Sequence, residues 1–402
     1  MMAWKKYTVE QLIDLDMLEA PMDGNHGSIH PKASDYVLTG VPFIMVNDIS
    51  NGHVDLKNCA FISEKQAATL RKGFAKPGDV LLSHKATIGR TAIVPNDFNT
   101  IILTPQITYY RVKKGIDNRF LKYYFDSPNF QSLFNNWAGS GSTRAYLGIT
   151  AQRKLPIILP ELDVQIKIAD ILSSLDEKID KNNEINNNLE QQAQVIFSNE
   201  FLSLETLPDS WMKASLIDVA DYLNGLAMQK YRPTADETGI PVLKIKELRQ
   251  DYCDDNSELC SPNIKSEYII HNGDVIFSWS GSLLVDFWCG GICGLNQHLF
   301  KVTSSRYDKW FYYAWTKHHL DRFIAVAADK ATTMGHIKRD ELSKAEVLIP
   351  NEADYNRIGA LVQPIYDLII SNRIENKKLA SLRDIILPKL MSGEINVSNL
   401  DI

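Results

Sequence analysis

Side chains that can make paired hydrogen bonds gather in three short loop segments in each half of the 402-residue chain. In the first half these segments are 83–90, 104–106 and 139–144, and each combines small residues with cationic, amide or hydroxyl groups. Arg, Lys, Gln and Asn can pair with the edges of nucleic-acid bases, and Ser, Thr and Tyr add further contacts. Any one of these residues could instead be an ordinary loop or capping residue, so the prediction concerns the set. The candidates are Lys85, Thr87, Arg90, Gln106, Ser142, Thr143 and Arg144 in the first half, and Trp279, Ser280, Gln297, His298, Lys330, Thr332 and Thr333 in the second.

Motifs for catalysis are absent from the sequence. It contains no G-x-x-x-x-G-K-[ST] phosphate loop, no G-x-S-x-G nucleophile turn and no H-E-x-x-H metal motif. The segment Ser127-Pro128-Asn129-Phe130 is the nearest to the Asn/Asp-Pro-Pro-aromatic motif of adenine methyltransferases, but it lacks the second proline. Asp79 and Asp274 each follow a glycine, which favours turn residues over a scattered acidic nuclease site. The sequence therefore predicts a non-catalytic chain.

The cysteines and histidines do not predict a metal site. Cys289 and Cys293 lack a matching second pair, and the nine histidines show no ligand spacing; His318 and His319 fit a helix surface better. Five cysteines, few and odd in number, favour a reducing compartment. No apolar run reaches about 18 residues, and the N-terminus lacks the apolar stretch of a signal peptide. We therefore expect a cytoplasmic protein with no cofactor of its own and no membrane partner.

Charge is distributed unevenly along the chain. The net charge is −6, which taken alone argues against a general polyanion binder. Residues 64–154, however, contain 14 Lys/Arg and 5 Asp/Glu, whereas the other residues contain 29 basic and 44 acidic groups. A basic region within an acidic chain is typical of a surface that contacts phosphates, although chance clustering on a solvated surface is the alternative.

The elements that would carry these loops occur twice. Gly78-Asp79-Val80 corresponds to Gly273-Asp274-Val275, and Gln106 corresponds to Gln297, at offsets of 195 and 191. β-branched and aromatic residues predict short strands in each copy, and aromatic spacing predicts helices near 120–134 and 310–323. The fold class is therefore α+β with an internal repeat. The predicted segments are 1–155 and 208–345 as two similar globular domains, with helical regions at 156–207 and 346–402.

A seam of apolar residues spaced by three and four predicts a long helix after each globular domain. Both seams include two asparagines, Asn182 and Asn186 in the first and Asn372 and Asn376 in the second, at an offset of 190. If the helices pack antiparallel, Asn182 faces Asn376 and Asn186 faces Asn372, since both sums are 558. Buried asparagine pairs of this kind fix helix register. A parallel pair, or exposed asparagines on ordinary helices, are the alternatives.

This layout resembles the specificity subunit of type I restriction-modification systems. The similarity covers nearly the whole chain and depends on the duplicated layout, on Gly78-Asp79-Val80, on 155–172 and on the ending 382–395. The second copy departs at Tyr355, where the first has Gln165. The resemblance implies two target-recognition domains, each contacting one half of a bipartite, asymmetric site in double-stranded DNA. The resemblance also implies that long helices separate the two domains. Because a whole globular domain must fit between the end of the first helix and the start of the second, we predict that the helices form an antiparallel coiled coil with a pseudo-twofold relation.

The resemblance also implies partners that carry the chemistry. Two modification subunits would bind the helices and methylate adenine with S-adenosylmethionine, and restriction subunits would cleave DNA using ATP and magnesium. The chain itself would be a non-catalytic specificity subunit. The alternative is an adaptor or anti-restriction scaffold that keeps the helices and binds the modification subunits without reading DNA.

Overall fold

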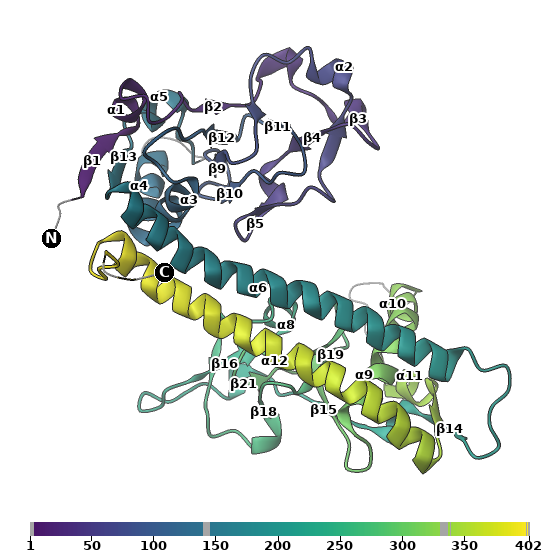
Figure 1. Ribbon diagram of the computed structural model, residues 1–402. Helices are drawn as coiled ribbons and strands as arrows, with labels where there is room; N and C mark the ends of the chain where they lie inside the picture. The colour runs from purple at the N-terminus through teal and green to yellow at the C-terminus, as the bar shows by residue number, and fades with distance from the viewer. Residues whose placement is uncertain (1–3, 140–144, 330–336, 338, 399, 401–402) are drawn as a thin grey trace. The chain divides into compact units, whose positions relative to one another are not determined.

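The structure, a computed structural model, describes residues 4–139, 145–329, 337, 339–398 and 400 (Figure 1). The chain forms two compact units. The first unit contains 1–177 and 380–402, and the second contains 178–379. Each unit therefore combines one globular domain with parts of both long helices.

The first unit contains two small sheets. In one, β9 lies between β10 and β12, and the short β2 pairs with the outer edge of β12. In the other, the order is β3-β7-β4-β11-β8, and β4 and β11 are parallel. The strand bounds are β2 Met22–Asp23, β3 Tyr36–Val37, β4 Val41–Ile44, β7 Ala60–Ile62, β8 Phe74–Ala75, β9 Val80–Ser83, β10 Thr91–Ile93, β11 Ile101–Leu103 and β12 Ile107–Tyr110.

Helices α3 (Asn118–Asp126) and α4 (Pro128–Gly139) cover the first of these sheets with aromatic side chains. The predicted helical spacing over 120–134 is confirmed, but the helix breaks at Ser127, whose φ of −62° and ψ of 141° are extended. Pro128 explains the break, because the ring of a proline disfavours the α conformation in the residue before it. The core under these helices includes the fully buried Phe120 and Phe125.

The second unit repeats this plan with the sheets β15-β22-β19-β20 and β17-β16-β21-β18. The parallel pair β16 and β21 corresponds to β4 and β11, and β19 corresponds to β9. Helices α9 (Lys309–His318) and α10 (Leu320–Asp329) correspond to α3 and α4. The predicted α+β repeat is therefore confirmed. The strand bounds are β15 Asp221–Asn224, β16 Ile240–Leu243, β17 Leu259–Cys260, β18 Ile269–Ile270, β19 Val275–Ser278, β20 Leu284–Phe287, β21 Cys293–Leu295 and β22 Leu299–Thr303.

Each globular domain is closed by a two-stranded sheet next to its long helix. In the first unit β1 (Lys5–Thr8) pairs antiparallel with β13 (Pro156–Leu159). In the second unit β14 (Met212–Ser215) pairs in the same way with β23 (Glu346–Ile349). The strand after each domain therefore returns to the strand that opens it and leads directly into the long helix.

The long helices are α6 (Leu162–Phe197), which ends in a π-helical turn at Ser198–Leu202, and α12 (Glu352–Met391). In the second unit Asn182 Nδ2 donates a 2.8 Å hydrogen bond to Asn376 Oδ1, and Asn372 Nδ2 donates a 2.9 Å bond to Asn186 Oδ1. Residue numbers that rise on one helix while they fall on the other show antiparallel packing, so the parallel alternative is wrong (Figure 1).

The start of each long helix is held by a different side chain in the same role. Gln165 Oε1 accepts a 3.1 Å hydrogen bond from the backbone N–H of Asp117, which precedes α3. At the corresponding place Tyr355 Oη accepts a 2.7 Å bond from the N–H of Asp308, which precedes α9. The departure from the repeat at Tyr355 therefore keeps the contact between long helix and domain.

Two smaller expectations are settled by side-chain contacts. Asp79 and Asp274 accept hydrogen bonds from the backbone N–H groups of Lys76 and His271, three residues earlier, which confirms both as turn residues. The expectation of a histidine pair on a helix surface is wrong for His319, which is 9% exposed and hydrogen-bonds to the Glu346 carbonyl at 2.8 Å.

In the described part of the chain, no helix combines the length and apolar character that crossing a bilayer requires.

Candidate nucleic-acid interface

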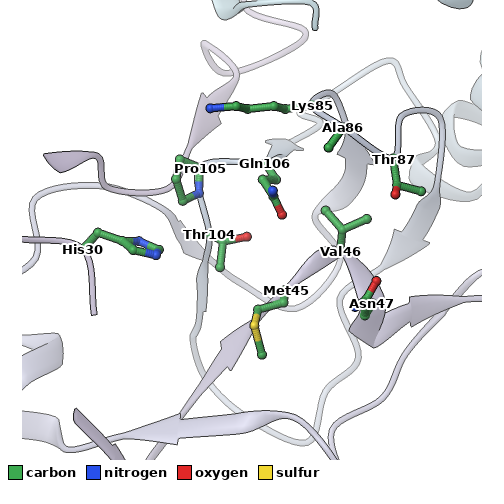
Figure 2. Close-up of a pocket in the computed structure, with 10 residues that line it drawn as sticks. All are labelled: His30, Met45, Val46, Asn47, Lys85, Ala86, Thr87, Thr104, Pro105 and Gln106. Carbon is green, nitrogen blue, oxygen red and sulfur yellow. The ribbon is translucent and has the colours of Figure 1, made fainter. Parts of the chain in front are cut away.

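Three of the predicted residues, Lys85, Thr87 and Gln106, line one pocket of about 400 Å³ in the first unit (Figure 2). We call it the first loop pocket. Its side chains come from loops that are distant in sequence, and Figure 2 shows them arranged around a common space. The lining residues are His30, Met45, Val46, Asn47, Lys85, Ala86, Thr87, Thr104, Pro105 and Gln106.

The parallel strands β4 and β11 explain why these loops meet. Ile44 pairs with Leu103 at the carboxyl ends of the two strands, so the residues that follow each strand enter the same space. Those residues are 45–47 and 104–106. Ligands commonly bind at the carboxyl ends of parallel strands, because the loops there converge. The third loop is joined to this set by the backbone N–H of His84, which donates a 2.9 Å hydrogen bond to the Gln106 carbonyl.

The loop that carries Lys85 has an unusual backbone. Ala86 has a φ of +65°, a left-handed conformation that is uncommon for a residue with a side chain. The corresponding residue of the second unit is Gly281, with the same φ of +65°. Ala86 is held by its N–H, which donates a 3.0 Å hydrogen bond to the Ala145 carbonyl, and Lys85 and Tyr146 form an isolated bridge. The equivalent turns therefore present 85–87 and 280–282 in the same backbone form.

Two polar atoms of the first loop pocket lack a hydrogen-bond partner within the described residues. They are His30 Nδ1 and Thr104 Oγ1, and Thr104 as a whole is 5% exposed. A buried polar atom without a partner costs free energy, so such atoms usually mark a place for a water or a ligand. Burial also lowers the pKa of His30, which keeps its imidazole neutral near pH 7 and able to both donate and accept. Together with the Gln106 amide and the Lys85 ammonium, these groups offer both donors and acceptors.

Arg90 lies outside the first loop pocket. Its Nη1 donates 3.0 Å hydrogen bonds to the carbonyls of Val46 and Ile49, and its backbone N–H donates to Ser83 Oγ at 2.8 Å. Arg90 therefore ties the loop after β9 to the loop after β4, and it supports the wall to which Val46 belongs. Its predicted contact with DNA stays a prediction.

The second unit brings four of its predicted residues together in a cluster at the corresponding place. Trp279 Nε1 donates a 3.0 Å hydrogen bond to Asn224 Oδ1, and its ring lies 5.6 Å from that of Phe300 in a stacked arrangement. Ser280 Oγ lies 3.1 Å from His298 Nδ1, and Gln297 Nε2 lies 3.4 Å from His298 Nε2. We call the set of Asn224, Trp279, Ser280, Gln297 and His298 the second loop cluster.

Backbone contacts show that the two sites are equivalent. The carbonyl of His84 accepts a 3.0 Å hydrogen bond from the N–H of Leu147, and the carbonyl of Trp279 accepts a 2.9 Å bond from Ile337. The offsets of 195 and 190 are those of the sequence repeat. The partner segments lead back to loops that contain further predicted residues, all of which lie outside the described residues: Ser142, Thr143, Arg144, Lys330, Thr332 and Thr333.

Sequence reasoning missed several residues of these sites. His30 and the segment 45–47 reach the first loop pocket only through the tertiary fold, and no local pattern marks them. Thr104 could have been found, because it lies in the same turn as Gln106. Asn224 ends β15, and its place beside Trp279 likewise depends on the fold. Among the described residues no group of three His, Cys, Asp or Glu side chains could hold a metal ion.

A duplicated α+β domain with matching loop sites, each followed by a long helix of an antiparallel pair, defines a class of protein with two recognition modules on one chain. The family model "Type I restriction modification DNA specificity domain" matches residues 3–191 and 208–382, and the chain belongs to this family.

Relatives of known kind agree with this assignment. The chain is 25% identical over 396 residues to the type I restriction enzyme MjaIX specificity subunit of Methanocaldococcus jannaschii, covering 92% of this chain and 90% of that protein. It is 22% identical over 434 residues to the HindI specificity subunit of Haemophilus influenzae, with coverage of 88% and 94%. The crystal structure of a type I restriction-modification S subunit from M. genitalium covers 96% of both chains with a TM-score of 0.58 and 14% identity, which shows the same fold.

Proposed function

We propose that the chain is the DNA-binding specificity subunit of a type I restriction-modification complex. Each unit reads one half of a bipartite, asymmetric site in double-stranded DNA, the first through the first loop pocket and the second through the second loop cluster. The observation that carries the proposal is the equivalence of these two sites. Polar side chains occupy the same backbone positions in both copies, yet their identities differ: Lys85 and Gln106 of the first unit correspond to Ser280 and His298 of the second, because Ser83 pairs with Ile107 as Ser278 pairs with Leu299. When the backbone is the same in the two units but the side chains differ, each unit can recognise a different base sequence, as an asymmetric DNA site requires.

Phosphate contacts are expected mainly in the first unit. The stretch 64–154 has a net charge of +9, whereas 265–346 contains 10 basic and 9 acidic residues. Since phosphate neutralisation supplies most of the salt-dependent affinity for DNA, the first unit supplies more of it than the second. The second unit depends more on base and water-mediated contacts.

The exposed face of α12 supports docking of modification subunits on the helices. In the second unit Leu361 and Leu368 are 48% and 45% exposed and lie seven residues apart, which places them on one face of the helix. In the first unit Leu382 and Ile385, on the same helix, are 47% and 60% exposed. Large apolar side chains repeated along an exposed helix face mark a surface that a partner covers. The partner we propose is a methyltransferase subunit that supplies S-adenosylmethionine chemistry.

Catalysis then belongs to the partners. Methylation of adenine is the work of the modification subunits, and ATP- and magnesium-dependent cleavage is the work of the restriction subunits. The chain acts in the cytoplasm, where its DNA target lies.

The experiment that tests the function is co-expression of the chain with its modification subunits, followed by sequencing of methylated bases in host DNA. We expect one bipartite motif with adenine methylated in each half. Selection of random DNA by the same purified complex should enrich that motif. If neither method yields a motif although the complex assembles, the chain is an adaptor or anti-restriction scaffold.

A pair of matched variants assigns the half-sites. Gln106→Ala should relax or alter the half-site read by the first unit and leave the other half intact, because only the first loop pocket loses a donor and acceptor. Gln297→Ala should do the reverse. A loss of both halves, or of neither, in both variants would contradict the assignment of the two loop sites while leaving the subunit function open to the motif experiment.

A further inference from the structure

Two thiols of the second unit lie in contact. Cys253 Sγ is 3.4 Å from Cys293 Sγ, although the residues are 40 positions apart in sequence. Cys253 lies in the loop after α8 (Ile245–Gln250) and is partly exposed, whereas Cys293 is fully buried at the start of β21. The pair therefore joins a solvent-accessible sulfur to a sulfur in the core.

The surroundings shift the pKa values of the two thiols in opposite directions. The hydrogen bond from Cys293 lowers the pKa of Cys253, even though burial and the nearby Glu247 carboxylate act in the opposite direction. The same hydrogen bond raises the pKa of Cys293, and burial of this thiol raises it further. The other three cysteines are buried, and burial raises the pKa of Cys59, Cys260 and Cys289 to about 11. A low pKa and solvent access are what a cysteine needs to react with an oxidant.

We propose that Cys253 and Cys293 are a thiol oxidation site, which a peroxide converts into a disulfide. The Cys253 thiolate attacks one peroxide oxygen, the O–O bond breaks, and after protonation of the leaving oxygen the products are a Cys253 sulfenic acid and water. The Cys293 sulfur then attacks the Cys253 sulfur, the S–O bond breaks, and the hydroxyl leaves as a second water with the thiol proton. Two thiols are oxidised and one peroxide is reduced.

The position of the pair gives the disulfide a structural consequence. β21 pairs with the parallel strand β16 and leads directly into Asn296, Gln297 and His298 of the second unit. The loop of Cys253 also contains Asp251, whose carboxylate pairs with Arg373 of α12 at 2.9 Å. A bond between Cys253 and Cys293 would fasten this loop to the strand that carries part of the second loop cluster. The inference does not depend on the proposed function, because its test needs no DNA.

The test is titration of the reduced full-length chain with hydrogen peroxide, with thiols counted under denaturing conditions and peptides mapped by mass spectrometry. We expect the loss of two thiols per chain, a cross-linked peptide that joins Cys253 to Cys293, and full reversal by a dithiol reductant. Cys59→Ser is the matched control, because it removes a buried cysteine of the first unit and should leave the cross-link unchanged.

Two further variants separate the steps. Cys253→Ser should abolish the loss of thiols at peroxide concentrations that oxidise the unmodified chain. Cys293→Ser should leave Cys253 as a sulfenic acid that a 1,3-dione reagent traps. The reduced Cys253→Ser variant should melt at the temperature of the unmodified chain. The reduced Cys293→Ser variant, which places a hydroxyl at a fully buried position, should melt at a lower temperature but keep the circular dichroism spectrum of the folded chain. Oxidation of Cys253 to sulfinic acid without a cross-link in the unmodified chain, or oxidation of other cysteines first, would overturn the proposal.

Discussion

The side-chain amide of Asn372 donates a 2.9 Å hydrogen bond to Oδ1 of Asn186, and both residues are more than nine-tenths buried, at 8% and 6% exposed. Leu189 and Ile369, three residues from each asparagine, belong to the surrounding apolar cluster. A polar pair enclosed in an apolar seam specifies register, since a shifted alignment would place each amide against hydrocarbon.

Asn186→Leu should destabilise the second unit by about 1–3 kcal/mol, because the Asn372 amide would remain buried without its partner. The double variant with Asn372→Leu should recover most of this loss, since both polar groups are gone. Urea unfolding followed by circular dichroism measures both. If the double variant is as unstable as the single one, packing and not the hydrogen bond sets the cost.

Arg373 ties the second globular domain to α12. Its guanidinium pairs with Asp286 at 2.8 Å and with Asp251 at 2.9 Å, and its side chain is 16% exposed. Arg373→Met should cost on the order of 3 kcal/mol in unfolding free energy, because Asp286 loses the counter-charge that lies 2.8 Å away and Asp251 keeps only Lys377, at 2.9 Å. The control is Lys181→Met, whose ion pair with Glu184 is exposed and should be worth at most about 1 kcal/mol. Equal effects in urea unfolding would contradict the structural role of Arg373.

His84 should make the first unit sensitive to acid. Burial lowers its pKa to about 4, whereas the unfolded chain has a histidine pKa of about 6.5. The unfolded state therefore binds more protons as the pH falls below about 6.5, so the contribution is fully present above that value and is lost as the pH falls toward about 4. At pH 5 the loss should be about 2 kcal/mol.

His84→Gln removes this titration, and the amide of glutamine can still donate toward the Leu147 carbonyl that His84 Nδ1 contacts at 3.1 Å. The measurement is urea unfolding of both proteins at about pH 7.5 and pH 5, where the other histidines titrate in both and cancel in the comparison. An equal loss on acidification in the two proteins would show that His84 is not the group responsible.

Leu361→Lys combined with Leu368→Lys should prevent assembly with the modification subunits and leave the isolated chain folded. Both side chains are nearly half exposed, so the charges are tolerated in water but not in an apolar interface. Size-exclusion chromatography with the partner subunits measures assembly, and circular dichroism checks the fold. Thr303→Lys with Ser305→Lys adds the same charge at exposed positions of the second unit, and it should assemble normally. Normal assembly of the leucine variant would place the docking surface elsewhere.

The fold was largely predictable because its main signals are periodic. The repeat offsets and the apolar seams depend on residues such as Gly78, Gly273, Asn182 and Asn376, which the same geometry requires in both halves. The break between α3 and α4 was also available from Pro128. The sequence alone did not show which residues belong to each unit. Residues 380–402 belong to the first unit although more than 200 residues separate them from residue 177, so this assignment depends on tertiary packing.

The site was predictable only in part. Lys85, Thr87 and Gln106 have the right residue types in loops that follow recognisable strands, and the fold brings them together. His30 carries no such signal, since its place depends on tertiary contacts. Residue type was also ambiguous for Arg90, because a guanidinium suits a backbone carbonyl as well as a base edge.

Because the first unit contains residues from both ends of the chain, it can complete its core only late in protein synthesis. Its core includes Val9 and also Leu390 and Val397, each at most 1% exposed, so residues from near both ends of the chain complete one apolar cluster. The second unit lies within one continuous stretch, 178–379. On a ribosome, therefore, all residues of the second unit emerge before the first unit has its last core residues. The apolar side chains of the first unit that these residues cover therefore stay exposed until translation has passed α12 and reached Val397.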